Sequence, residues 1–241
     1  DLDCDGIYAV FSVGPKALFL EARLAADRGD MAAAQEAVRT AMQLSDHLVG
    51  SEAPSMLEYF MGTNIREQAA NFVIETILPA GQADPAVWES VLNPAVQTPA
   101  DFSRIMRGEW NRMMQFSLLP ALADPAADRA PTDAEMLAET FTNYYSDTVL
   151  TNNSLSLTDL PSHPNPFYDT SDLSWRSRQI TGPAAGYPFR ESWERKQIQT
   201  GRIQAAFAIL KGQPVPSDPI YGQPYSWNPE TRLLGMPKGP E

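Results

Sequence analysis

The sequence holds little of the material from which most active sites are built. Its 241 residues include one cysteine, Cys4, and two histidines, His47 and His163. A single cysteine excludes an internal disulfide framework and a cysteine-rich zinc site. The glycine-rich phosphate loops G-x-G-x-x-G and G-x-x-x-x-G-K-[ST] are absent, and so is the G-x-S-x-G motif of esterases. We therefore assign no catalytic residue, no cofactor-binding residue and no metal ligand from these patterns.

Basic residues and long apolar runs are also scarce. Lys and Arg number 18 against 30 Asp and Glu, which gives a net charge of −12 at pH 7. Nucleic acids and anionic membranes both need a basic face, so we expect neither as a partner. No run of about 18 apolar residues occurs, so none of these residues is expected to span a membrane. Because the chain starts at Asp1 rather than Met, we expect an earlier start: a methionine, a tag, a signal peptide or a membrane anchor.

What the sequence has in quantity is apolar residues at helical spacing. Hydrophobic residues make up 43% and charged residues 20%, the balance of a globular protein. Pro15 suits the start of a first helix, Gly29 its end, and Asp30 the cap of a second helix that continues to Leu48. This pair resembles a single tetratricopeptide-type hairpin. No second copy follows at a 34-residue spacing, so we expect no repeat array.

Further helices are expected beyond this pair. Thr98 with Asp101, and Thr132 with Glu135, have the spacing of helix N-terminal caps. In the last helix, we expect the apolar side chains from Trp193 to Leu210 to face inward. The expected ranges are about Pro54–Leu78, a short helix from Asp84-Pro85, Thr98–Leu118, Thr132–Tyr145 and Glu191–Lys211.

Prolines divide the sequence into two parts. Of the 21 prolines, 12 lie in residues 151–241, and Ser162–Pro166 cannot be helical. We predict a helical body over residues 1–150. Residues 151–241 are expected to form a long Pro-rich connection (151–190), the final helix and a small β tail packed on the body. In that tail, residues 225–227 are expected to pair with residues 232–234 across a turn. The predicted fold is mainly α: an irregular helical bundle with a small C-terminal β-hairpin.

The N-terminus has the most specific spacing of acidic residues. Asp1, Asp3 and Asp5, followed by Gly6, match the first half of an EF-hand calcium loop. The twelfth position, where that loop needs a bidentate glutamate, is Ser12. A calcium site and a solvated acidic terminus therefore remain as alternatives. Cys4, between Asp3 and Asp5, has acidic neighbours and no basic one, which disfavours a reactive thiolate.

The histidines carry no catalytic pattern. His47 follows Asp46 near the end of the second predicted helix, where a capping or surface position is expected. His163 lies between Ser162 and Pro164, and a serine adjacent to a histidine in sequence does not make a triad.

Four glutamates provide the alternative of an enzyme. Glu52, Glu58, Glu67 and Glu75 lie in or near the third predicted helix, and some of them could share one side of it. Two carboxylates that converge in a cleft would suit a hydrolase. No Glu-x-x-His is present, so a di-iron bundle is not indicated. The alternative for these residues is a solvated helix face.

Two features carry a family resemblance. The Gly29-Asp30 helix pair ending in Met42–Leu48, and the segment Met106–Trp110, resemble a set of exported bacterial helical proteins that typically begin with a membrane helix. The tail from Asp218 to Tyr225 has the pattern D-P-x-x-G-x-P-aromatic, which resembles the end of the major pseudopilins of type II secretion. The helix Arg202–Leu210 would match the end of the pseudopilin stem. This resemblance implies an extracytoplasmic, cell-envelope location and no particular activity.

The leading hypothesis is a non-catalytic, extracytoplasmic structural or protein-interaction subunit of a cell-envelope assembly. Tyr225 and Trp227 alternate with a serine, as in a half-buried strand, and could form an aromatic recognition edge. Two alternatives remain open: a carboxylate-dependent hydrolase, and a calcium-stabilised binding module that uses Asp1, Asp3 and Asp5. The expected partners are proteins.

Overall fold

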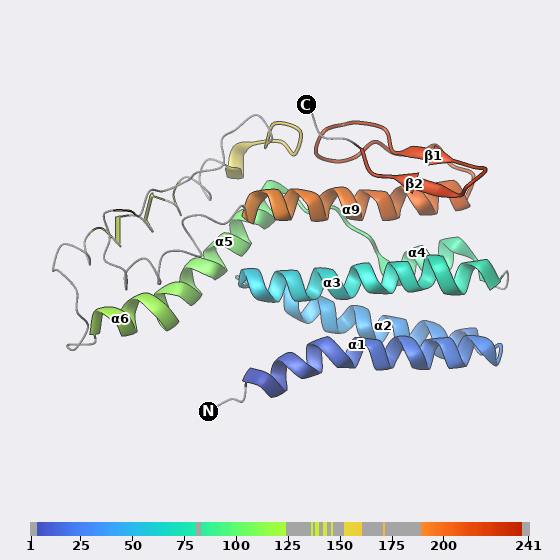
Figure 1. Ribbon diagram of the computed structural model, residues 1–241, viewed down its shortest axis with the longest axis horizontal. Helices are drawn as coiled ribbons and strands as arrows, with labels where there is room; N and C mark the ends of the chain where they lie inside the picture. Colours follow the sequence, from blue (N-terminus) through green and yellow to red (C-terminus); the bar gives the residue numbers. More distant parts are fainter. Residues whose placement is uncertain are drawn as a thin grey trace. The chain divides into compact units, whose positions relative to one another are not determined.

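The protein is mainly helical, with a small antiparallel hairpin near the C-terminus, as the sequence predicts (Figure 1). The chain divides into two compact units. The first comprises Asp1–Ser51, Leu57–Val96 and Lys196–Glu241, and the second comprises Glu52–Met56 and Gln97–Arg195. The computed structural model describes residues 4–80, 83–123, 136, 138–139, 142–143, 146, 152–160, 171 and 189–237. The boundary predicted near residue 150 lies outside these residues.

The first unit begins with the predicted helix pair, α1 (Cys4–Asp27) and α2 (Met31–Val49). Gly29 has a φ of +78°, which a glycine adopts without a steric penalty, and the Asp30 side chain accepts a hydrogen bond from the Ala33 N–H at 3.0 Å. These local signals confirm the predicted turn. Small side chains fill the interface and allow the two helices to approach closely; those fully buried are Ala22, Ala25, Ala34 and Ala41.

The predicted start of α1 at Pro15 is wrong, because the helix begins at Cys4 and contains Pro15. A proline inside a helix clashes least when the preceding residue has no Cβ, and residue 14 is a glycine. The Gly14-Pro15 pair therefore lets the helix continue through a residue that usually marks a helix start.

Helix α3 (Met56–Phe72) continues through a π-helical turn, Val73–Ile77, and a 3₁₀ turn, Leu78–Ala80. Gly62 allows α3 to approach α2 closely, since a Cβ there would lie 2.4 Å from Val49 Cγ2. Ser45 Oγ donates to the Gly62 carbonyl at 2.8 Å across the same contact. A glycine that weakens the helical pattern in the sequence thus has a packing role.

Helix α4 (Pro85–Leu92) starts where the sequence predicts. The Asp84 carboxylate caps it by accepting from the Ala86 N–H at 2.8 Å. Trp88 and Leu92 of α4 join one apolar core with side chains of α1, α2, α3 and the long C-terminal helix. The other large buried members of this core include Phe19, Ile65, Val73, Ile77 and Phe207.

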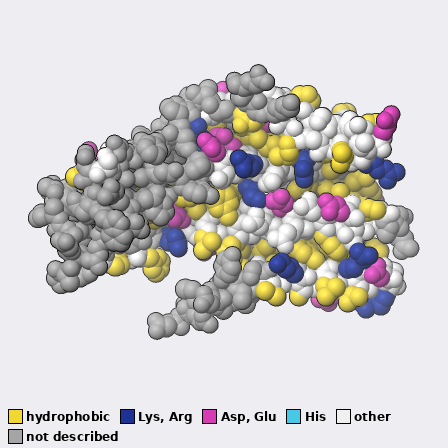
Figure 2. Space-filling view, in the orientation of Figure 1, with side chains coloured by type: hydrophobic (Ala, Val, Ile, Leu, Met, Phe, Trp, Pro, Cys, Tyr) yellow, Lys and Arg dark blue, Asp and Glu magenta, His cyan; other side chains and the backbone are white. Residues whose placement is uncertain are grey.

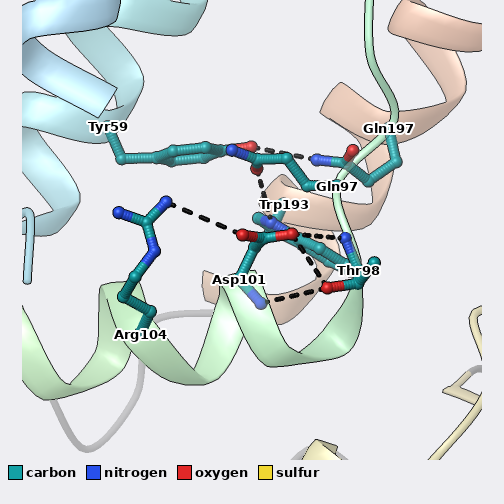
Figure 3. Close-up of polar contacts among 7 residues, drawn as sticks. All are labelled: Tyr59, Gln97, Thr98, Asp101, Arg104, Trp193 and Gln197. Carbon is teal, nitrogen blue, oxygen red and sulfur yellow. Dashed lines mark hydrogen bonds and ion pairs between the residues drawn. The ribbon is translucent and has the colours of Figure 1, made fainter. Parts of the chain in front are cut away.

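Helix α9 (Phe189–Leu210) passes from the second unit into the first between Arg195 and Lys196. In the first unit, Gln197 Nε2 donates to the Tyr59 hydroxyl at 3.0 Å (Figure 3), and Lys196 Nζ lies 2.7 Å from a Glu67 carboxylate oxygen. Leu210, predicted to face inward, is 48% exposed. It is the last residue of the helix, just before the chain turns at Gly212 with a φ of +67°.

The second unit contains α5 (Pro99–Met113), a π-helical turn Met114–Leu118, α6 (Leu119–Ala123) and a 3₁₀ turn Asn152–Ser154. The predicted cap of α5 is confirmed as a reciprocal capping box (Figure 3). The Asp101 N–H donates to Thr98 Oγ1 at 3.3 Å, and the Thr98 N–H donates to Asp101 Oδ2 at 2.8 Å.

Trp193 provides the largest buried side chain among the described residues of the second unit. Its ring lies 5.2 Å from that of Phe102, between centroids, and its Nε1 donates to Gln97 Oε1 at 3.2 Å. Beside it on α9, Arg190 and Glu194 form a buried ion pair at 3.2 Å. Burial raises the pKa of Glu194, and the positive charge of Arg190 opposes that rise.

A short segment, Glu52–Met56, crosses α5 in the second unit; we call it the strap. A Cβ at Gly108 of α5 would lie 2.2 Å from the Pro54 carbonyl oxygen and 2.4 Å from that of Ala53. The adjacent Glu109 is buried, and its Oε2 accepts from the Met56 N–H at 2.9 Å. Because Met56 is the first residue of α3, this carboxylate also stabilises the N-terminus of that helix.

Several predictions lie outside the described residues. These are the helix expected from Thr132 and Glu135, apart from a few isolated positions, the segment Ser162–Pro166 with His163, and the two acidic residues Asp1 and Asp3.

Candidate interaction surface at the C-terminal tail

The C-terminal tail, which we define as Asp218–Gly235, is organised by one buried carboxylate. Asp218 Oδ1 accepts from the N–H groups of Ile220 at 3.0 Å and Tyr221 at 2.7 Å. Its Oδ2 accepts from the Gln223 N–H at 2.7 Å. Gly222 completes the loop with a φ of +66°, a conformation that favours glycine. The aspartate and glycine of the tail motif therefore act together to fold the loop.

The loop docks on α9 at a second glycine. The Tyr225 hydroxyl donates to the Ile198 carbonyl at 2.7 Å. A Cβ at Gly201 would lie 2.4 Å from that hydroxyl oxygen and 2.8 Å from Pro219 Cδ. Ile220 is fully buried, so this contact excludes water. Gly201 therefore provides the close approach that lets the tail seat against the helix.

Burial also changes the acid–base behaviour of Tyr225. Removal from water raises the pKa of its hydroxyl, and the negative charge of Asp218 raises it further. The positive charge of Arg202 acts in the opposite direction but is the smallest of the three effects. The hydroxyl therefore remains a hydrogen-bond donor throughout the neutral range.

Beyond this anchor, β1 (Ser226–Asn228) pairs antiparallel with β2 (Leu233–Gly235), and Trp227 faces Leu234 (Figure 1). The predicted strands at 225–227 and 232–234 are each one residue too early. Tyr225 is occupied by its contact with α9, so the first strand starts after it. Arg232 has a φ of +54° and still belongs to the turn, so the second strand starts at Leu233.

The hairpin exposes apolar side chains and strand edges. Leu233 is 67% exposed and Trp227 is 37% exposed, whereas Tyr225 is 4% exposed. The two predicted edge aromatics therefore have different positions: Tyr225 is an internal anchor, and Trp227 is accessible. In the part of the chain that the structure describes, neither strand has another strand on its outer side. Such edges and exposed aromatic side chains are typical of protein contacts.

An open groove of about 500 Å³ lies in the same unit, between α4, the end of α9 and the segment that follows it. Its lining includes one carboxylate, Glu89, which forms an ion pair with Lys211. Gln204 Nε2 donates across it to the Pro94 carbonyl at 2.7 Å. A lone, ion-paired carboxylate does not provide the two converging acids of a hydrolase.

The structure does not bring the predicted glutamates together into such a pair. Glu67 is ion-paired with Lys196, whereas Glu52, Glu58 and Glu75 are exposed. His47 is exposed in the last turn of α2.

The calcium hypothesis for the N-terminus is only partly covered by the structure. Asp1 and Asp3 lie outside the described residues, while Asp5 and Gly6 belong to α1 rather than to a loop. Among the residues that the structure covers, no group of three or more His, Cys, Asp or Glu could hold a metal ion.

Comparisons with known proteins add no assignment. The chain matches no family model, no curated protein and no solved structure. In the described ranges, no helix is both long enough and apolar enough to cross a bilayer.

The important residues that sequence reasoning missed are two helix glycines and one acid. Gly108, Glu109 and Gly201 gain their roles from segments that cross the helices from elsewhere in the chain. The only local signal was a glycine inside a helical pattern, which indicates either a packing site or a weak point.

Proposed function

We propose that this protein is a non-catalytic structural or protein-interaction subunit of an extracytoplasmic cell-envelope assembly, and that it contacts a protein partner through the tail hairpin. The observation that carries the proposal is the contrast within the tail. The loop that starts at Asp218 is held by hydrogen bonds to this carboxylate, and Tyr225 fixes the tail to α9 through the Ile198 carbonyl. Leu233 and Trp227 remain accessible on the hairpin.

Fixing the tail favours binding because little conformational entropy remains to be lost when a partner docks. Asp218 and Tyr225 supply this rigidity through hydrogen bonds to backbone groups. Trp227 pairs with Leu234 and so lies on the opposite face of the hairpin from Leu233, which means that each face offers one exposed apolar side chain. An exposed aromatic side chain is the kind of anchor that contributes most of the energy of small protein interfaces.

The cell-envelope location rests on the sequence pattern. The tail motif, D-P-x-x-G-x-P-aromatic, resembles the end of the major pseudopilins, which are extracytoplasmic assembly subunits. The Asp218 loop gives this motif a physical reason, since its aspartate, glycine and aromatic positions each have a defined contact. The pattern therefore supports the proposed location, and fractionation of the source cells tests it separately.

The decisive experiment is a native-mass measurement of the complex isolated under mild conditions, from the wild type and from a Trp227→Ala/Leu233→Ser variant. We expect the wild type to be recovered with a partner of defined mass and the variant to be recovered without it. Leu57→Ser, which also removes a half-exposed leucine but from α3, is the matched control and should retain the partner.

Circular dichroism melting of all three proteins establishes that partner loss does not come from unfolding. Equal recovery of the partner by the wild type and the tail variant would refute the hairpin as the contact surface. Recovery of the wild type as a lone monomer, with turnover in a hydrolase panel, would refute the non-catalytic assignment and restore the carboxylate enzyme.

A further inference from the structure

A second apolar surface lies on α1, far from the tail in sequence. Val13, Leu20 and Leu24 are 60%, 61% and 50% exposed, and Ala17 between them is also exposed. Figure 2 shows hydrophobic side chains along α1, with Lys and Arg side chains beside them. The opposite face of α1 contributes Phe19, Ala22 and Ala25 to the core, so this stripe is not the face that packs against α2. Contiguous exposed apolar side chains of this kind mark contact sites.

The spacing of the stripe is that of a coiled-coil seam. Its four residues follow one another at intervals of four, three and four, which is the alternation of the a and d positions of a heptad. Ala17 and Leu24 occupy a positions, and Val13 and Leu20 occupy d positions. Pro15 falls on the face directed into the protein's own core, where it is buried, and so does not interrupt the seam. Asp27 occupies the next d position and ends the apolar run, so the seam has four apolar positions, each of which would form one layer with the same residue of a partner helix.

The charges beside the seam identify the occupant. In a parallel pair of helices, the residue before an a position faces the residue after a d position on the partner helix. On α1 these flanking residues are Lys16 and Arg23 on one side, and Glu21 and Arg28 on the other. A parallel second copy places Lys16 against the partner's Glu21 twice, through the two-fold symmetry of such an interface. Neither residue forms an ion pair within the described part of the chain.

The alternative arrangements are less favourable. An antiparallel copy would face Lys16 with Arg23, which repel each other. The second flanking pair of the parallel arrangement is Arg23 with Arg28, but Arg23 is already bound to Asp27 of its own helix at 3.2 Å. Its charge is therefore partly compensated in either arrangement, and only the parallel one adds the attractive contact between Lys16 and Glu21.

We infer that α1 is a self-association surface, on which a second copy of this chain packs its own α1 in parallel and in register to form a symmetric dimer. Four apolar layers make a small interface, so the dimer is expected to dissociate in the micromolar range. This inference is independent of the proposed function: the dimer uses α1, and the partner contact uses the tail.

Sedimentation velocity of the full chain over a range of micromolar concentrations tests the dimer. The wild type should shift from monomer to dimer as concentration rises. Leu20→Glu should remain monomeric throughout that range, while Val87→Glu, which adds the same charge at a half-exposed apolar position on α4, should dimerise like the wild type.

A charge exchange tests the parallel register without altering the apolar seam. Lys16→Glu places two carboxylates against each other at each flank and should raise the dissociation constant at least several-fold. Lys16→Glu combined with Glu21→Lys restores opposite charges and should return the constant close to that of the wild type.

Each result decides the inference. A wild type that stays monomeric at every concentration overturns it, and so does a dimer that is indifferent to Leu20→Glu. A dimer that loses stability with the single charge change and does not regain it with the exchange overturns the parallel register. Circular dichroism of each variant confirms that the exposed substitutions leave the fold intact. Partner binding by the tail is unaffected by any of these outcomes.

Discussion

The strap and the tail cross their helices in the same way, over a glycine. In the second unit, the strap carbonyls of Ala53 and Pro54 lie where a side chain at Gly108 would be. In the first unit, Tyr225 and Pro219 of the tail occupy the equivalent space over Gly201. A carboxylate accepts backbone N–H groups at both crossings: Glu109 at the strap and Asp218 in the tail.

The two crossings differ in how the crossing segment is held. The strap joins α2 to α3, and the atoms that it places against Gly108 are backbone carbonyl oxygens. It therefore cannot move away from α5 without moving the chain on both sides of it. The tail follows α9 through the exposed linker Gln213–Ser217 and meets its glycine mainly with a side chain. The same local arrangement therefore holds a segment that the chain continues at both ends in one case, and a separable C-terminal element in the other. The energetic effect of a substitution is limited at the tail to the free energy of docking.

The largest effect is expected at the strap, from Gly108→Ala. The new Cβ would lie 2.2 Å from a backbone oxygen, and neither the strap nor α5 can move away independently. We expect a loss of about 3 kcal/mol in the free energy of unfolding, after the better helix propensity of alanine is included. Urea unfolding followed by circular dichroism measures it. A change smaller than about 0.5 kcal/mol would show that the strap is free to shift.

The next effect in rank, similar in size but confined to the tail, is expected from Asp218→Ala, which removes the acceptor of three backbone N–H groups. The free energy of tail docking should fall by about 3 kcal/mol. The loss cannot exceed the free energy of docking itself, because water binds the three N–H groups once the tail has undocked. Amide hydrogen exchange at Ile220, Tyr221 and Gln223 should become about 100-fold faster, with little change in global unfolding. Asp218→Asn keeps one acceptor oxygen and should give an intermediate rate. Unchanged exchange in the alanine variant would contradict the central role of this carboxylate.

A smaller effect is expected from Gly201→Ala, because Tyr225 and Pro219 can move away with the tail. We expect about 2 kcal/mol of lost tail docking, measured by the same exchange experiment. Tyr225→Phe alone should cost about 1 kcal/mol through the lost hydrogen bond to Ile198. In the double variant the hydroxyl no longer meets the new methyl group, so the two losses should be less than additive by about 1 kcal/mol. If the two losses are additive instead, the new methyl group at position 201 does not clash with the Tyr225 hydroxyl.

The smallest effect is a dependence of tail docking on alkaline pH. The pKa of Tyr225 is raised in the folded protein above its unfolded value of about 10. The contribution of this hydroxyl is therefore complete well below pH 10. It declines as the pH rises through about 10, because the undocked tyrosine ionises first. At about pH 10.5 the expected loss is about 0.8 kcal/mol. Tyr225→Phe should lack this component, and equal pH profiles for the two proteins would contradict the assignment.

The sequence predicted best what is determined locally. Asp30, Asp84 and Thr98 cap helices through contacts with residues two or three places further along the chain, so their spacing was informative. The mainly helical class follows from the same short-range periodicity. The hairpin was found one residue out of place, because the anchoring of Tyr225 to α9 shifts the start of the first strand.

What the sequence did not predict depends on distant contacts. Glu109 binds the N–H of a residue 53 positions away, and Tyr225 binds a carbonyl 27 positions away. In the candidate surface, Trp227 and Tyr225 were predicted as equivalent aromatics. Only the packing against Gly201 distinguishes the internal one from the accessible one.

The proline inside α1 has a mechanical consequence. Pro15 has no N–H, so the helical hydrogen bond to the Phe11 carbonyl cannot form, and α1 has one backbone hydrogen bond fewer at that level. The helix is therefore less resistant to bending at Pro15 than elsewhere, although it stays continuous from Cys4 to Asp27. A segment that precedes this helix in a longer chain would therefore be attached through a helix that bends more easily at Pro15 than a regular helix does.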